Sequence, residues 1–111
     1  MNMEKHLKEL LTYYLKQKLN KLQQQIEPVE NPPPDLKILT YGMTLGYMDI
    51  ITEKEIMPEK INKWKEIISE GNKLIILIPK EEKLKITELL WKEGIAERVS
   101  IGTYEINLFL P

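Results

Sequence analysis

The acidic side chains that could act together lie within residues 32–55. Three consecutive prolines precede Asp35, and a turn bounded by glycines separates it from Asp49, Glu53 and Glu55. Convergent carboxylates serve as general acids and bases or bind a divalent cation. The one histidine, His6, lies far in sequence from Ser69 and Ser100, and the 111 residues include no cysteine, so the sequence gives no sign of nucleophile–histidine catalysis or of a cysteine-type zinc site. Carboxylate and metal chemistry remain.

The pairing of the two strands around this turn decides which carboxylates meet. A hairpin symmetric about Thr44 places Asp35 opposite Glu53, with Cβ atoms about 4.5–5.5 Å apart. Because side chains alternate along a strand, Asp35, Asp49, Glu53 and Glu55 then share one face. The other face, which turns to the core, carries Leu36, Ile38, Met48 and Ile50.

Burial of such a pair of carboxylates would require a cation. Two unit charges about 5 Å apart repel by roughly 3 kcal/mol at an effective dielectric constant near 20. The pattern therefore predicts a site for Mg²⁺ or Mn²⁺, which proteins hold with one or two carboxylates together with water and substrate phosphate. The alternative is that these acids solvate an exposed strand beside a turn.

The first 26 residues predict a long amphipathic helix, because apolar residues recur at three- and four-residue steps. These residues are Leu7, Leu10, Leu11, Tyr14, Leu15, Leu19, Leu22 and Ile26. Such a helix must bury its apolar stripe against the rest of the domain or against a second copy of itself. Docking on the sheet and a homodimer formed through this helix are both open.

Residues 27–34 hold four of the seven prolines and predict a stiff connector to an α/β core over residues 35–111. The expected core elements are strands 36–41 and 45–53, a helix from Pro58 to Gly71, strand 73–79, a helix over 81–93 ended by Gly94, and strand 98–110. A strand–helix–strand crossover pairs its strands in parallel. The order α-β-β-α-β-α-β therefore predicts a single α/β domain with a mixed four-stranded sheet.

Composition limits the partners and the location. At 42% hydrophobic and 30% charged residues the chain is typical of a soluble domain, and no apolar run approaches the roughly 18–20 residues of a membrane span. The absence of a signal-peptide pattern predicts a cytoplasmic protein, and abundant Lys, Glu and Ile with a single Arg is typical of a thermophile. A basic series on the first helix could contact nucleic acid or be a solvated helix face: Lys5, Lys8, Lys16, Lys18 and Lys21.

Pro34-Asp35 followed by Glu53-Lys54-Glu55 resembles the motif of the PD-(D/E)XK, restriction-endonuclease-like nuclease superfamily. In that fold a Pro-Asp on one strand and a Glu-x-Lys on the next bind the metal, and a helix precedes them. The resemblance implies Mg²⁺-dependent hydrolysis of phosphodiester bonds in DNA. Relative to the family, one of three early strands is missing or shrunk into the connector.

The resemblance also assigns roles to residues. Catalytic roles fall to Asp35, Glu53, Lys54 and Lys60, and metal-binding roles to Asp35, Asp49, Glu53 and Glu55. Glu55 occupies the family's lysine position, so a lysine that has migrated to the next helix, Lys60 or Lys63, would supply the missing cation. The rival hypothesis is a non-enzymatic interaction or assembly module with the same fold, which pairs through the N-terminal helix.

Overall fold

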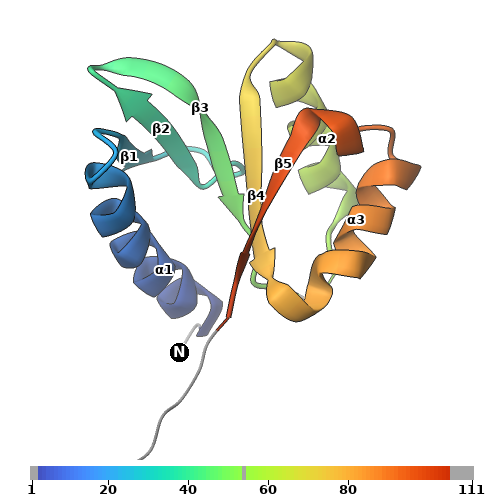
Figure 1. Ribbon diagram of the computed structural model, residues 1–111. Helices are drawn as coiled ribbons and strands as arrows, with labels where there is room; N and C mark the ends of the chain where they lie inside the picture. Colours follow the sequence, from blue (N-terminus) through green and yellow to red (C-terminus); the bar gives the residue numbers. More distant parts are fainter. Residues whose placement is uncertain (1–2, 54, 106–111) are drawn as a thin grey trace, which may run out of the picture.

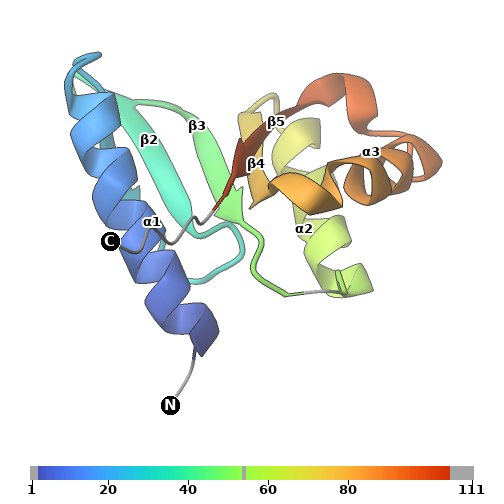
Figure 2. The same cartoon turned by 60° about the horizontal axis from the view of Figure 1, so that its bottom comes forward.

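A five-stranded mixed sheet separates one helix from two others in the computed structural model, which describes residues 3–53 and 55–105 (Figure 1). The elements are α1 (Met3–Asn20), β1 (Gln25–Pro28), β2 (Leu36–Thr40), β3 (Met43–Ile50), α2 (Pro58–Ser69), β4 (Lys73–Pro79), η1 (Lys80–Glu82), α3 (Lys83–Lys92), η2 (Ala96–Arg98) and β5 (Val99–Tyr104). The helix α1 lies against β1–β3, and α2 and α3 cover the opposite face at β4 and β5 (Figure 2).

The strands lie in the order β1-β2-β3-β4-β5. The first three pair antiparallel, whereas β3, β4 and β5 pair in parallel through the crossover helices α2 and α3. A single α/β domain with a mixed sheet and an N-terminal helix is therefore confirmed. The predicted number of four strands is wrong. The part of the last predicted strand beyond residue 105 lies outside the described residues.

The additional strand is β1, which forms where the end of the first helix and the start of the connector were predicted. Ile26 pairs with Ile38 of β2 and is buried in the core instead of ending a helix. The helix stops at Asn20 because Gln23 adopts a left-handed backbone conformation with φ 60°. Gln24 N–H then donates to Leu19 O at 3.0 Å, which is the bonding pattern of a Schellman cap. The prediction of a helix through residue 26 is therefore wrong.

The turn between β2 and β3 is tighter than predicted. Tyr41 and Gly42 both have positive φ, at 48° and 79°, and Thr40 pairs directly with Met43. Two residues with positive φ form a type I′ turn, whose twist matches that of the flanking strands. The hairpin is therefore not symmetric about Thr44.

The observed register changes the carboxylate pair. Leu36 lies opposite Met48, so continuing the ladder by one residue places Asp35 opposite Asp49. The predicted pairing of Asp35 with Glu53 is wrong, since β3 ends at Ile50 and Glu53 lies in the segment beyond it.

The alternation of buried residues on the hairpin agrees with the prediction. The residues expected on the core face, Leu36, Ile38, Met48 and Ile50, form one cluster with Ile26 and Leu77. A second cluster on the other face of the sheet surrounds Trp64 and the β4 residues Leu74, Ile76 and Ile78, all fully buried. The side chain of Asp49 points to this second face of the sheet. Among the described residues, Asp49 is the one charged residue that is buried.

The apolar residues of α1 divide between the sheet and the surface. Leu11, Leu15 and Leu19 pack against the hairpin cluster, so α1 docks on the sheet. A homodimer through α1 stays a prediction, and it would have to use the exposed Leu10 and Leu22. No helix in residues 3–53 and 55–105 is long and apolar enough to cross a membrane.

Gly46 allows β3 to approach β4 closely. A Cβ atom at this position would lie 2.7 Å from Lys73 O and 2.8 Å from Lys73 Cβ. We expect Gly46→Ala to lower the free energy of unfolding by about 1–3 kcal/mol, measured by urea denaturation. Gly102→Ala is the control, because its Cβ would meet only the flexible end of Leu77 at 3.2 Å. Equal losses in both variants would contradict this account.

Candidate functional site

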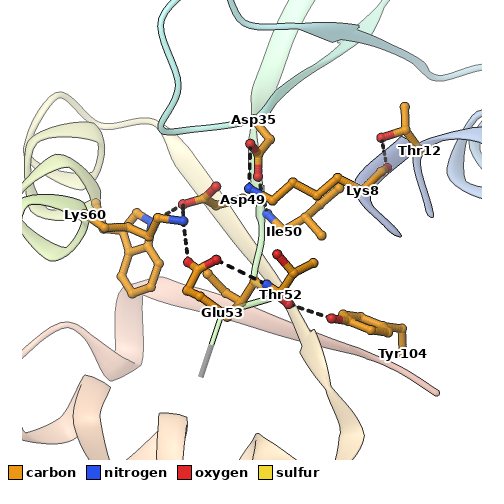
Figure 3. Close-up of polar contacts among 11 residues, drawn as sticks. Lys8, Thr12, Asp35, Asp49, Ile50, Thr52, Glu53, Lys60 and Tyr104 are labelled. Atoms are coloured by element: carbon orange, nitrogen blue, oxygen red, sulfur yellow. Dashed lines mark hydrogen bonds and ion pairs between the residues drawn. The ribbon is translucent and has the colours of Figure 1, made fainter. Parts of the chain in front are cut away.

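Charged side chains from three elements and two connecting segments meet where β2 begins and β3 ends. Asp35 directly precedes β2, and Asp49 is the penultimate residue of β3. Lys8 reaches this place from α1 and Lys60 from the first turn of α2, while Glu53 comes from the segment after β3 (Figure 3). The group comprises three carboxylates and two ammonium groups.

Asp35 is held by one backbone and one side-chain donor. Its Oδ2 accepts a hydrogen bond from Ile50 N–H at 2.8 Å, and its Oδ1 accepts one from Lys8 Nζ at 3.3 Å. Burial alone would raise the pKa of Asp35, but the hydrogen bonds from Asp49 and Ile50 and the charge of Lys8 hold that pKa below its usual value. Asp35 is therefore the ionised member of the pair.

Asp49 is fully buried, and its carboxyl oxygens differ in their surroundings. Oδ2 accepts a hydrogen bond from Trp64 Nε1 at 2.6 Å, whereas Oδ1 is buried with no donor among the described residues. When Asp49 is protonated, its carboxyl group can donate a hydrogen bond to Asp35. Burial, followed by this hydrogen bond, raises the pKa of Asp49 to about 7. At neutral pH the two carboxyl groups thus share one proton for part of the time.

Lys60 bridges two of the carboxylates. Its Nζ lies 2.6 Å from Glu53 Oε1 and 3.9 Å from Asp49 Oδ2. Burial would lower the pKa of Lys60, but the nearby Asp49 and Glu53 carboxylates raise it above its usual value. Burial would raise the pKa of Glu53, yet Lys60 holds it below its usual value. Lys60 therefore stays charged beside the pair.

The structure brings together four of the residues selected from the sequence: Asp35, Asp49, Glu53 and Lys60. Glu55 lies apart from them, because it is exposed and lines a different groove with residues of α3. Lys54 lies outside the described residues. Lys63 also lies apart, exposed and paired with Glu66 on its own helix.

Two residues that contact these carboxylates were not among the predicted site residues. Lys8 belongs to the basic series of the first helix, and Trp64 lies on α2. Trp64 is in the core, but a buried indole N–H needs an acceptor, and in this protein the acceptor is Asp49. A tryptophan predicted to be buried therefore signals a nearby hydrogen-bond acceptor, and this signal is present in the sequence. Nothing in the local sequence linked Lys8 to Asp35, which lies 27 residues further along the chain.

The donors suit a hard divalent cation. Among the described residues, no group of three or more His, Cys, Asp or Glu side chains forms a ready-made cage for a metal ion. Mg²⁺, however, commonly binds through one or two carboxylates and keeps several waters. The unpaired Asp49 Oδ1 beside the ionised Asp35 is the arrangement expected if a cation replaces the shared proton. The residues present therefore fit Mg²⁺ or Mn²⁺.

None of the family models, curated proteins and solved structures compared with this chain matches it. Function therefore has to be inferred from the geometry of the carboxylate pair and its two lysines.

Proposed function

We propose that this protein is a Mg²⁺- or Mn²⁺-dependent nuclease of the PD-(D/E)XK type that hydrolyses phosphodiester bonds in DNA. The observation that carries the proposal is the placement of Asp35 opposite Asp49, with a buried carboxylate oxygen that has no hydrogen-bond donor among the described residues. When Asp49 is ionised and shares no proton with Asp35, this oxygen lacks a partner, whereas buried polar atoms in proteins are usually paired.

The arrangement of elements also supports this proposal. The resembled fold has a helix, three early strands, and then helix, strand, helix, strand, and β1 supplies the early strand that the sequence pattern lacked. In the observed register Asp49 takes the place of Glu53 as the second acid. Ile51 then follows at the lysine position of the motif, and Lys60 of α2 supplies the cation from elsewhere in the fold.

Asp35 and Asp49 would hold the metal ion in this proposal. A bound Mg²⁺ supplies an activated water and neutralises charge on the scissile phosphate. Trp64 fixes one oxygen of Asp49, so that the other oxygen faces Asp35. Glu53 holds Lys60 beside the pair, where its ammonium group can orient the attacking water or stabilise the developing negative charge.

Metal binding can be measured through Trp64, because this indole donates directly to Asp49. We expect Mg²⁺ or Mn²⁺ to change the fluorescence of Trp64 and to raise the melting temperature by ligand linkage. Trp91 is 60% exposed on α3, so Trp91→Phe removes the second tryptophan without disturbing the site. Asp35→Asn and Asp49→Asn should each abolish both responses in this background.

The matched control is Glu66→Gln, which removes an exposed carboxylate from the same helix as Lys60. It should leave both responses unchanged. No response of the parent protein at millimolar metal would remove the metal site and with it the proposed function. A response without cleavage of supercoiled plasmid, linear duplex or single-stranded DNA would leave a metal-binding protein and reject the nuclease.

A further inference from the structure

A groove of about 580 Å³ runs between α1 and the start of β2 and reaches Asp35, one member of the carboxylate pair. Asp35 and Ile50 form its wall at one end, and Tyr13 and Lys16 line it further along α1. Its size falls in the range of small-ligand sites, about 300–1,000 Å³. The groove can hold a few nucleotides but not a duplex.

We infer that this groove binds a short single-stranded segment of nucleic acid, with one base stacked on Tyr13 and the backbone directed toward Asp35. The inference rests on the proposed function for the class of ligand, and it adds the strandedness of the substrate and the residues that hold it. An aromatic platform next to lysines is how proteins commonly hold single strands.

Tyr13 has the properties of such a platform. Its side chain is 57% exposed although it lines the groove, and its ring is held edge-on against Tyr14 with centroids 5.7 Å apart. A ring held in this way loses little freedom when a base stacks on it. Tyr14 is 59% exposed but does not line the groove, which provides a matched control on the same helix.

The lysines of the groove set the number of phosphate contacts. Lys8 lies at the Asp35 end, and Lys16 lies eight residues further on, about 12 Å along the helix axis. The groove is lined by three lysines and three acids, Glu4, Glu9 and Asp35, so its formal charge is zero. Binding should therefore depend more on stacking than on charge, and it should be only weakly sensitive to salt.

The test is the anisotropy of a labelled short oligothymidylate, measured in EDTA so that no metal is bound and no strand is cut. We expect Tyr13→Ala to weaken binding about fivefold or more, and Tyr13→Phe to restore it. Tyr14→Ala should weaken binding much less than Tyr13→Ala, because Tyr14 contacts the Tyr13 ring but does not line the groove. If Lys8 and Lys16 each contact one phosphate, the expected slope of log K against log salt is about −1.4, and Lys16→Gln should change it to about −0.7.

Lys18→Gln is the control for Lys16, since Lys18 is exposed on α1 outside the groove. An oligouridylate of equal length shows whether DNA and RNA share this site. Absence of binding, equal effects of the Tyr13 and Tyr14 variants, or equal affinity for a duplex would each overturn the inference. Binding that depends on Tyr13 without any response to metal would uphold the groove and reject the nuclease. A metal response without dependence on Tyr13 would uphold the metal site and reject the groove.

Discussion

Asp49→Asn is expected to make the metal-free protein more stable at pH 8, although it removes a hydrogen-bonded buried side chain. Ionised Asp49 is buried beside ionised Asp35, and its Oδ1 has no donor among the described residues. Asparagine has nearly the same shape, and its carbonyl oxygen can still accept from Trp64. Its amide group can donate to Asp35 at any pH. The substitution therefore relieves a repulsion and supplies the missing hydrogen bond.

The pH dependence follows from the raised pKa of Asp49. Its pKa is about 7 in the folded protein and near the ordinary 3.8 in the unfolded chain. From about pH 4 to pH 7 the folded state binds more protons than the unfolded state, so the free energy of unfolding falls as pH rises. Three pKa units correspond to a loss on the order of 4 kcal/mol. The lowered pKa of Asp35 acts in the opposite sense at acidic pH, because its contribution is lost as pH falls.

Urea denaturation in EDTA at pH 5 and pH 8 measures this effect. The parent protein should lose stability between the two pH values, and the Asp49→Asn variant should lose much less. At pH 8 the variant should be the more stable by on the order of 2 kcal/mol. Glu66→Gln, at an exposed position, should follow the parent. A variant that is less stable than the parent at pH 8 would show that the pair is not under electrostatic strain.

This stability difference would bear on function as well. Natural proteins accept destabilising residues where an activity needs them. If Asp49→Asn stabilises the protein while abolishing the response to metal, the acid at this position is retained for binding rather than for folding. If the variant loses stability and keeps the response, the cation is held elsewhere.

The sequence predicted those parts of the fold that leave a local signal. Gly71 and Gly94 end α2 and α3 with φ of 84° and 76°, as their placement after periodic apolar residues indicated. The aliphatic run of β4 is buried in the sheet between β3 and β5. These elements are determined by residues close together in the sequence, so a sequence pattern can predict them.

The wrong predictions arise where a backbone conformation is adopted by a residue type that rarely adopts it. A left-handed cap is normally glycine or asparagine, but the chain uses Gln23, so the apolar periodicity through Ile26 predicted a longer helix. The turn uses Tyr41 before Gly42, whereas the two glycines of the segment favoured a wider turn centred on Thr44. That single difference moved the second acid from Glu53 to Asp49.

The two lysines of the site show a different limit. Lys60 lies seven residues from Glu53 at the start of α2, so a short segment brings it back toward the pair, and it was among the selected residues. Lys8 meets Asp35 only because α1 docks across β1–β3. The docking direction of a helix is set by packing along its whole length, and a sequence pattern does not contain it.

Lys60→Gln is expected to separate catalysis from metal binding. The lysine contacts Glu53 and Asp49 but is not itself a metal ligand, so the Trp64 fluorescence response to Mg²⁺ should persist at pH 8. Cleavage should fall by about 10²–10³-fold, the typical loss when one group that stabilises a transition state is removed. Loss of Lys60 also removes a charge that lowers the pKa of Asp49, so metal binding in the variant should need a higher pH.

Lys63→Gln is the matched control, because Lys63 lies one turn further along α2, exposed and paired with Glu66. It should retain full cleavage and an unchanged metal response. Single-turnover cleavage and the fluorescence titration are measured on the same preparations at pH 8. Unchanged cleavage in the Lys60→Gln variant would make Lys60 a structural ion-pair residue. Joint loss of cleavage and of the metal response would instead show that Lys60 acts by positioning Asp49. If Lys60 acts directly in the reaction, its removal leaves the carboxylate pair able to bind the cation.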